Sequence, residues 1–158
     1  MKIRTQENMK ADPNTVEITL ASDLRSVEAA EEITHKACEA AGLDAEDQHK
    51  VEMAVHESMI NAVCHGNKFD DAKRIWFRLQ VFPDRLEIRI RDQGEGFDPD
   101  SLADPLESEN LLRISGRGIF LIRAFMDEFR VQKLPGIGTE VTLLKRIATR
   151  NQNLIKED

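Results

Sequence analysis

Five short segments alternate apolar and polar residues, and this pattern restricts the fold more than any other feature of the sequence. The segments lie at 16–20, 75–81, 86–90, 129–131 and 141–143. Alternation over so short a run is typical of a β-strand with one buried face. Turns at 83–84 and 135–138 join the second segment to the third and the fourth to the fifth, so both pairs are predicted to be antiparallel.

Two helical patterns separate the first segment from the second. Ser22 is expected to cap a helix that ends at Gly42. The expected apolar side of this helix consists of Leu24, Val27, Ala30, Thr34, Ala37 and Ala41. Asp44 begins a second helix that reaches about His65. Its apolar stripe is Val51, Val55, Met59 and Ala62.

A long segment rich in glycine, proline and acidic residues, 92–118, precedes a third helix over 119–126, expected to be buried on most sides. The order of elements favours an α+β fold, a two-layer sandwich with helices on one face of a mixed, mostly antiparallel sheet. Since no linker is evident, one domain is expected at 15–146, with a polar extension at 1–14 and a polar tail at 147–158.

Composition narrows the function classes. One Trp, no Tyr and a formal net charge of −7 disfavour a nucleic-acid-binding protein. No apolar run is long enough to span a bilayer, and no signal peptide is recognisable, so we expect a cytoplasmic protein that does not bind membranes. Cys38 and Cys64 form no CxxC pair and are expected to be free thiols.

Polar residues gather at four places. Glu57 and Asn61 are spaced i,i+4 and share a helix face with His65, which alone would fit a solvated face. Asp92 ends the third alternating segment and is followed by Gly94 and Gly96, which would also fit a glycine-rich turn. The run 115–118 (SGRG) precedes the third helix, where free N–H groups suit phosphate binding. Gly138 and Thr139 precede the last segment.

Several other chemistries fit poorly. The pair His56-Glu57 begins a zinc-helix pattern, but position 60 is Ile and the second ligand is missing. The glycine loop lacks the third glycine of a dinucleotide fingerprint, and no P-loop or nucleophile elbow is present.

The four clusters occur in one order and together resemble the Bergerat-fold ATPases and kinases, the GHKL superfamily. The chain is most similar to the small anti-sigma serine/threonine kinases of the RsbW and SpoIIAB type. The runs 57–68 (ESMINAVCHGNK), 92–99 (DQGEGFDP) and 115–127 (SGRGIFLIRAFMD) carry the resemblance, which extends over about residues 15–145.

The resemblance implies an ATP and Mg²⁺ site. Asn61 would ligate Mg²⁺, and Glu57 would be the catalytic base. Asp92 would contact the adenine amino group with support from Thr139, in a pocket shaped by Gly94 and Gly96. The residues implied near the phosphates are His65, Lys68, Gly116, Arg117 and Gly118, and 98–114 would be the ATP lid.

The resemblance also implies partners. The chain would phosphorylate a STAS-domain anti-anti-sigma protein and sequester an RNA polymerase sigma factor, as a homodimer. The alternative is a binding module of another partner-switching pathway, gated by nucleotide, with little or no phosphoryl transfer. A detached histidine-kinase domain is a weaker third option, because no phosphoacceptor helix is recognisable.

Overall fold

The elements follow the order predicted from the alternation. The computed structural model describes residues 13–95 and 114–148, apart from the side chains of 114–116. The elements are β1 (Thr15–Ala21), α2 (Leu24–Ala41), α3 (Ala45–Ile60), a π-helical segment η1 (Asn61–Gly66), β2 (Arg74–Val81), β3 (Arg85–Asp92), α5 (Ile114–Phe125), β4 (Glu128–Leu134) and β5 (Gly138–Arg146).

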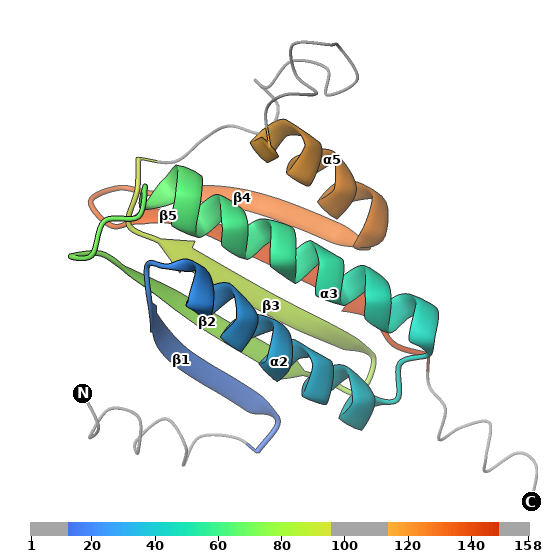
Figure 1. The fold of residues 1–158 in the computed structure, drawn as a ribbon. Coiled ribbons are helices and arrows are strands. Elements are labelled where there is room, and N and C mark those ends of the chain that lie inside the picture. Colours follow the sequence, from blue (N-terminus) through green and yellow to red (C-terminus); the bar gives the residue numbers. More distant parts are fainter. Residues whose placement is uncertain (1–12, 96–113, 149–158) are drawn as a thin grey trace, which may run out of the picture.

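The strands form a single sheet in the order β1-β2-β3-β5-β4. Every strand pair in the described part of the chain is antiparallel. The sequence analysis expected a mostly antiparallel sheet with some parallel pairing, and this part of the chain contains no parallel pair. Figure 1 shows α2, α3 and α5 together on one face of the sheet. The predicted α+β class with helices on one face is confirmed.

The core lies between this face and the helices. Strand side chains such as Phe77 and Ile88 meet Val55 and Met59 of α3, and all four are fully buried. The predicted stripe on α3 is confirmed, since its four members are at most 3% exposed. Burial of each large side chain contributes roughly 1.5–3 kcal/mol, so the α3–sheet contact anchors the helix that carries Glu57.

The helix caps agree with the sequence except at one residue. Gly42 adopts a left-handed conformation after α2, and the Asp44 carboxylate accepts a hydrogen bond from the Asp47 N–H, both as predicted. Ser22 is not the cap of α2. Asp23 takes that position, because its backbone is extended and its Oδ1 accepts from the Arg25 N–H at 2.9 Å.

Two predicted apolar faces, one on the first strand and one on the first helix, are only partly buried. Val16 and Ile18 of β1 are 39% and 37% exposed, and Leu24 at the start of α2 is 51% exposed. The reason is geometric: β1 is an edge strand, and α2 covers it only in part. An open groove of about 360 Å³ remains between Val16, Leu79 and the α2 residues Ile33, Ala37 and Ala40.

The third helix differs in extent and burial. It begins at Ile114 rather than Ile119, so the SGRG run lies within its first turns instead of before it. Ile119, Ile122 and Met126 are buried, but Phe120 is 52% exposed. One side of α5 therefore packs on the core, not most sides, because the helix lies at the margin of the layer (Figure 1).

Both cysteines are free thiols, as predicted. Burial raises the pKa of the Cys38 thiol to about 12. No helix in the described part of the chain has the length and apolarity that crossing a membrane requires.

Candidate nucleotide-binding site

Helix α3 and its π-helical continuation carry the first part of the site. Asn61 is only 4% exposed, and its Oδ1 is buried without a hydrogen-bond partner among the described residues. A solvated polar face, the simple alternative for this helix, is therefore wrong at Asn61. An unpaired buried amide oxygen costs about 1–3 kcal/mol, so this atom calls for an external partner. A hard cation or its water shell suits an amide oxygen.

Helix α5 closes the site over Glu57 and Asn61. A Cβ built at Gly118 would lie 2.8 Å from Oε1 of Glu57 and 3.6 Å from Nδ2 of Asn61. Gly118 thus leaves room for both side chains where the two helices meet. N–H groups in the first turn of a helix have no partner within that helix, and in α5 this turn lies directly before Gly118.

Asp92 forms the second part of the site at the end of β3. It is 5% exposed, and its Oδ1 accepts a hydrogen bond from the Gly94 N–H at 2.8 Å. Burial raises the pKa of the Asp92 carboxyl, while hydrogen bonds from the Gly94 and Thr139 backbones and the charge of Lys73 oppose that rise. A buried carboxylate with remaining acceptor capacity suits a ligand that donates a hydrogen bond.

Glycines let the two parts of the site approach closely. A Cβ at Gly66 would overlap the Asp92 carboxylate, and a Cβ at Gly94 would overlap the Gly66 carbonyl oxygen. Gly66 ends the π-helical segment that Asn61 begins, and such segments often occur at functional sites. The end of the π-helical segment therefore lies directly against the Asp92 carboxylate.

Thr139 lies opposite Asp92 in the β3–β5 register. It is 1% exposed, and no residue in the described part of the chain forms a hydrogen bond with its buried Oγ1. Gly138 and Thr139 are the first residues of β5 rather than part of the turn before it. The Asp92 carboxylate of β3 and the Thr139 hydroxyl of β5 thus lie together at one end of the sheet, where both can accept further hydrogen bonds.

Asn67 is a site residue to which the sequence analysis gave no role. It is 1% exposed; its Oδ1 accepts from the Gln93 N–H at 2.7 Å, and its Nδ2 donates to the Arg74 carbonyl at 3.1 Å. Asn67 therefore ties the end of η1 to β2 and to the Asp92–Gly94 turn. Two features of the sequence could have indicated it: Asn67 follows Gly66 at the end of a helix, and it belongs to the run 57–68 that carries the resemblance.

The remaining predicted residues are less closely gathered. His65, Lys68 and Arg117 are exposed, and Lys68 has a positive φ of 54°. Gly116 lies in the first turns of α5. Gly96 and the predicted lid over 98–113 fall outside the described residues.

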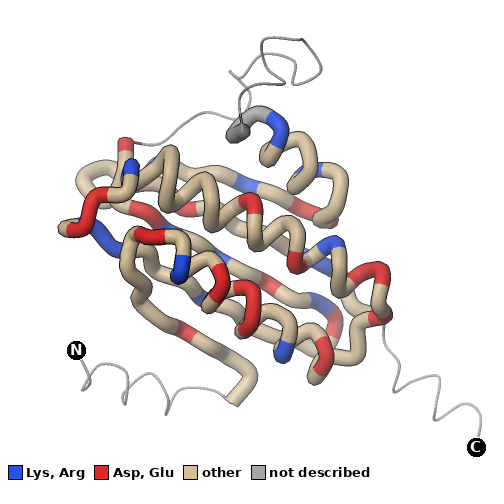
Figure 2. Tube along the Cα trace, viewed as in Figure 1, with Lys and Arg blue, Asp and Glu red and all other residues tan. Residues whose placement is uncertain are grey.

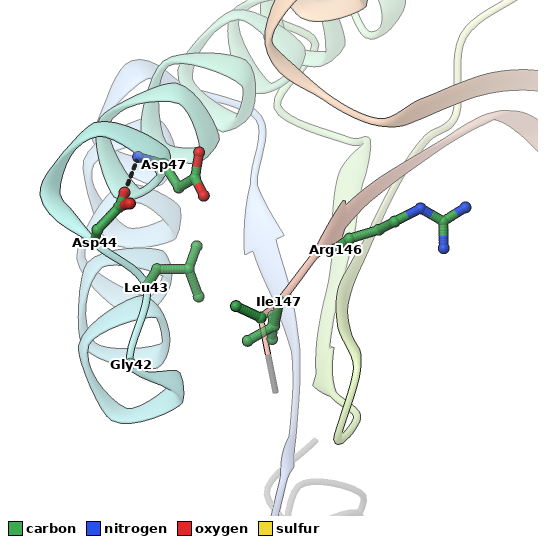
Figure 3. A pocket seen from close by; sticks show the side chains of 7 residues that line it. Gly42, Leu43, Asp44, Asp47, Arg146 and Ile147 are labelled. Atoms are coloured by element: carbon green, nitrogen blue, oxygen red, sulfur yellow. Dashed lines mark hydrogen bonds between the residues drawn. The ribbon is translucent and has the colours of Figure 1, made fainter. Parts of the chain in front are cut away.

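A separate hollow of about 500 Å³ lies at the other end of α3 (Figure 3). Labelled residues that line it are Gly42, Leu43, Asp44, Asp47, Arg146 and Ile147. Because α3 rises about 1.5 Å per residue from Ala45 to Ile60, this hollow is more than about 20 Å from Asn61. It is not part of the site that contains Glu57 and Asp92.

Comparison with protein-family models matches residues 20–145 to the histidine kinase-like ATPase domain. The chain belongs to the histidine kinase-like ATPase family. Family membership implies that the chain uses ATP, and it confirms the GHKL resemblance drawn from the sequence.

Curated relatives define a narrower group within the family. Serine-protein kinase RsbW of Staphylococcus epidermidis is 35% identical over 119 residues, which cover 70% of this chain and 75% of that protein. Serine-protein kinase RsbW of Bacillus licheniformis is 35% identical over 107 residues, covering 64% and 67%. Within the family, the chain belongs to the RsbW-like serine/threonine kinases, as the sequence predicted.

Two solved structures share the fold. The SiaB–SiaC complex of Pseudomonas aeruginosa matches with a TM-score of 0.63 at 12% identity, covering 92% of this chain and 97% of that one. The RsbU and RsbW domains of a Mycobacterium tuberculosis protein match with a TM-score of 0.55 at 18% identity, covering 84% of this chain and 32% of that one. At these identities the likeness supports the fold alone.

Proposed function

We propose that this protein transfers the γ-phosphoryl group of ATP to a serine or threonine hydroxyl of a partner protein. The observation that carries the proposal is the buried, unpaired Oδ1 of Asn61 beside Glu57, under Gly118 of α5. The RsbW relatives, which are named serine-protein kinases, support the same reaction class.

The residues present fit Mg²⁺ and ATP. Asn61 would supply one oxygen ligand to Mg²⁺, whose other ligands would be phosphate oxygens and water. Asp92 and the Thr139 hydroxyl would hold the adenine, and Gly94 and Gly96 would shape its pocket. Bound Mg²⁺-ATP supplies the phosphoryl donor and neutralises the charge that develops on it. Arg117, His65, Lys68 and the backbone of Gly116 and Gly118 would meet the phosphates.

Glu57 would act as the general base. Its half-buried carboxylate would accept the proton of the attacking hydroxyl as the oxygen–phosphorus bond forms and ADP leaves. Gly118 would position that carboxylate by leaving it space. A protein that only binds nucleotide needs Asn61 and Asp92 but has no use for a base, so the presence of Glu57 favours the enzyme over the binding module.

The partner proposed is a small STAS-domain anti-anti-sigma protein, in a circuit where its unphosphorylated form competes with an RNA polymerase sigma factor. The resemblance to the anti-sigma kinases supports this choice, and it also supports a homodimer in the cytoplasm. Sedimentation equilibrium of the purified chain tests the dimer.

The decisive experiment is calorimetric titration with ATP, with and without Mg²⁺, followed by incubation with a candidate STAS protein and intact-mass analysis. We expect binding that requires Mg²⁺ and one added phosphate on the partner. Asn61→Ala should abolish the Mg²⁺-dependent binding, whereas Glu57→Ala should bind ATP and fail to transfer.

Each other outcome has a definite meaning. Binding without transfer to any STAS protein would favour the binding module gated by nucleotide. Normal transfer by the Glu57→Ala variant would refute the base assignment. Absence of ATP binding by the folded wild-type chain would refute the site itself.

A further inference from the structure

The face of the sheet opposite the helices carries an unusual distribution of charge. Its residues alternate with the buried ones along each strand, and no helix or strand in the described part of the chain covers them. The basic residues of this face are all arginines: Arg74, Arg78, Arg85, Arg89, Arg91, Arg130 and Arg146. Its acidic residues are fewer, namely Glu17, Glu87, Glu128 and Glu140.

This open face is therefore net positive in a chain whose formal net charge is −7. Figure 2 shows the contrast: Asp and Glu positions gather along α2 and the start of α3, while Lys and Arg positions recur along the strands. A single-sign patch on a protein of opposite net charge attracts an oppositely charged partner and orients it.

The centre of the open face holds two like charges side by side. Arg78 of β2 pairs directly with Arg89 of β3 in the strand register. Arg130 of β4 lies in the same row, opposite Thr142 of β5, which itself pairs with Arg89. Like charges directly opposite each other destabilise a sheet. Glu17 of β1 lies opposite Arg78 on its other side, but its carboxylate accepts the Trp76 Nε1–H. The contact between Arg78 and Arg89 is therefore offset only in part, and it lowers stability unless an anionic group comes between the two side chains.

Part of this row lacks a partner within the structure. Arg78 has a buried Nε with no hydrogen-bond partner. Among the residues that the structure describes, Arg89 pairs with Glu87 at 3.8 Å, and Glu87 is already bonded to Arg85 at 3.1 Å. Because the Arg78 Nε is buried, an external acceptor would bind the terminal nitrogens of the guanidinium groups in this row. Guanidinium donors match carboxylates in a two-point geometry that lysine cannot provide.

In the neighbouring row of the open face, the side chains of Trp76, Arg91 and Glu140 are held by contacts with one another. Arg91 stacks on the Trp76 ring at 4.5 Å and pairs with Glu140 at 2.9 Å. The Trp76 Nε1 donates to Glu17 at 2.9 Å. Trp and Arg side chains held in fixed positions are the residue types that dominate protein–protein binding energy. This row provides a rigid border to the arginine row.

The dimensions of the face limit what it can hold. Five strands spaced about 4.8 Å apart and about seven residues long give a surface of roughly 20 Å by 23 Å. That is on the order of half of the 800 Å² that each partner contributes to a standard interface. A single extended or helical segment fits it better than a globular surface. Because four glutamates interrupt the arginines, the face lacks the continuous basic surface that the regular phosphates of a nucleic acid or a membrane require.

We propose that the open sheet face, centred on Arg78, Arg89 and Arg130, is a docking site for an acidic segment of a partner protein. The site is separate from the nucleotide site, because it lies on the other side of the sheet from α3 and α5 (Figure 1). Docking places partner carboxylates between the arginines and removes the like-charge contact.

Trp76 is the only tryptophan of the chain and lies next to the arginine row, so its fluorescence reports binding directly. The experiment titrates the full chain with a peptide of alternating glutamate and alanine at low ionic strength. A glutamine–alanine peptide serves as the uncharged control. The test variant is Arg78→Gln/Arg89→Gln/Arg130→Gln, and the matched control Arg25→Gln/Lys36→Gln/Lys50→Gln removes the same charge from the helical layer.

We expect the acidic peptide to change Trp76 fluorescence in the wild type and in the control variant. Binding should weaken about tenfold in the test variant, as loss of about 0.5 kcal/mol at each of three charge pairs predicts. Circular dichroism and ATP titration establish that both variants are folded. No response to the acidic peptide, or equal affinity in both variants, overturns the proposal. Binding to heparin or phosphatidylserine vesicles but not to the peptide overturns it as well.

Discussion

Gly118 of α5 lies so close to Glu57 of α3 that a single added methyl group would come within 2.8 Å of the Glu57 Oε1. The atom displaced is the far end of a flexible side chain, so the backbone has no need to move. A substitution at Gly118 can therefore move the Glu57 carboxylate without destabilising the fold, so it tests how the proposed base is positioned.

We expect Gly118→Ala to raise the free energy of unfolding and lower phosphoryl transfer. Alanine favours a helix over glycine by about 0.8–1 kcal/mol, while its methyl group pushes the Glu57 carboxylate from its position. Transfer should fall at least tenfold, since displacing a reacting group by about 1 Å costs on the order of 100-fold. Urea unfolding and single-turnover transfer measure the two effects.

Ala124→Gly is the matched control, because Ala124 is exposed on the same helix. It should lower stability by a similar amount and leave transfer unchanged. Full activity in Gly118→Ala would mean that Glu57 finds its working position without help from α5.

Asp92→Asn should stabilise the free protein and weaken ATP binding. Because burial raises the folded-state pKa of Asp92 above its usual 3.8, ionisation of this carboxyl opposes folding. The variant keeps an oxygen for the Gly94 N–H but carries no charge. Its stability advantage should be full above the folded-state pKa of Asp92 and disappear as the pH falls toward 3.8.

Urea unfolding of wild type and Asp92→Asn between neutral pH and pH about 4 measures this advantage. ATP affinity should fall about 10–100-fold, as expected for loss of a charged hydrogen-bond acceptor. An affinity equal to that of the wild type in the folded variant would count against a contact between Asp92 and the adenine.

Local sequence patterns predicted most of the fold. The alternation of Ile75, Phe77 and Leu79 and the stripe of Val51, Val55 and Met59 each reflect one buried face, and all six are at most 1% exposed. Such periodicity depends only on the residues of one element. Val16 and Ile18 show the limit of the method, because their exposure depends on how far α2 reaches over β1.

The candidate site was predicted in its residue types but not in its geometry. Glu57, Asn61 and Gly118 come together through the packing of α5 on α3, which no local pattern encodes. The π-helical segment and the two bonds of Asn67 were also missed, because they depend on long-range contacts with β2 and β3.

Asn67→Ala should destabilise the protein and weaken nucleotide binding. It removes the acceptor of the Gln93 N–H and the donor to the Arg74 carbonyl, which together should cost roughly 2–3 kcal/mol. ATP affinity should fall about tenfold, because the turn that follows Asp92 loses its support. Gln93→Ala is the control: the Gln93 side chain is exposed, and its Oε1 accepts the Arg74 N–H at 2.7 Å, so less than about 1 kcal/mol should be lost. An Asn67→Ala variant that binds ATP normally would separate this residue from the site.

Arg78→Gln should stabilise the free protein, although it removes a side chain from the middle of the sheet. Arg78 faces Arg89 across β2 and β3, while Glu17 on its other side is engaged by the Trp76 Nε1–H. Relief of the like-charge pair should therefore raise the free energy of unfolding by about 0.2–1 kcal/mol at low salt. The gain should vanish in 1 M salt, where screening extends over only about 3 Å. Lys50→Gln, which removes a cation paired with Glu46 at 3.4 Å, should instead show no gain at either salt concentration. A loss of stability in Arg78→Gln at low salt would mean that packing of the arginine stem outweighs repulsion. A salt-dependent gain would indicate that the arginine row is retained for binding rather than for folding.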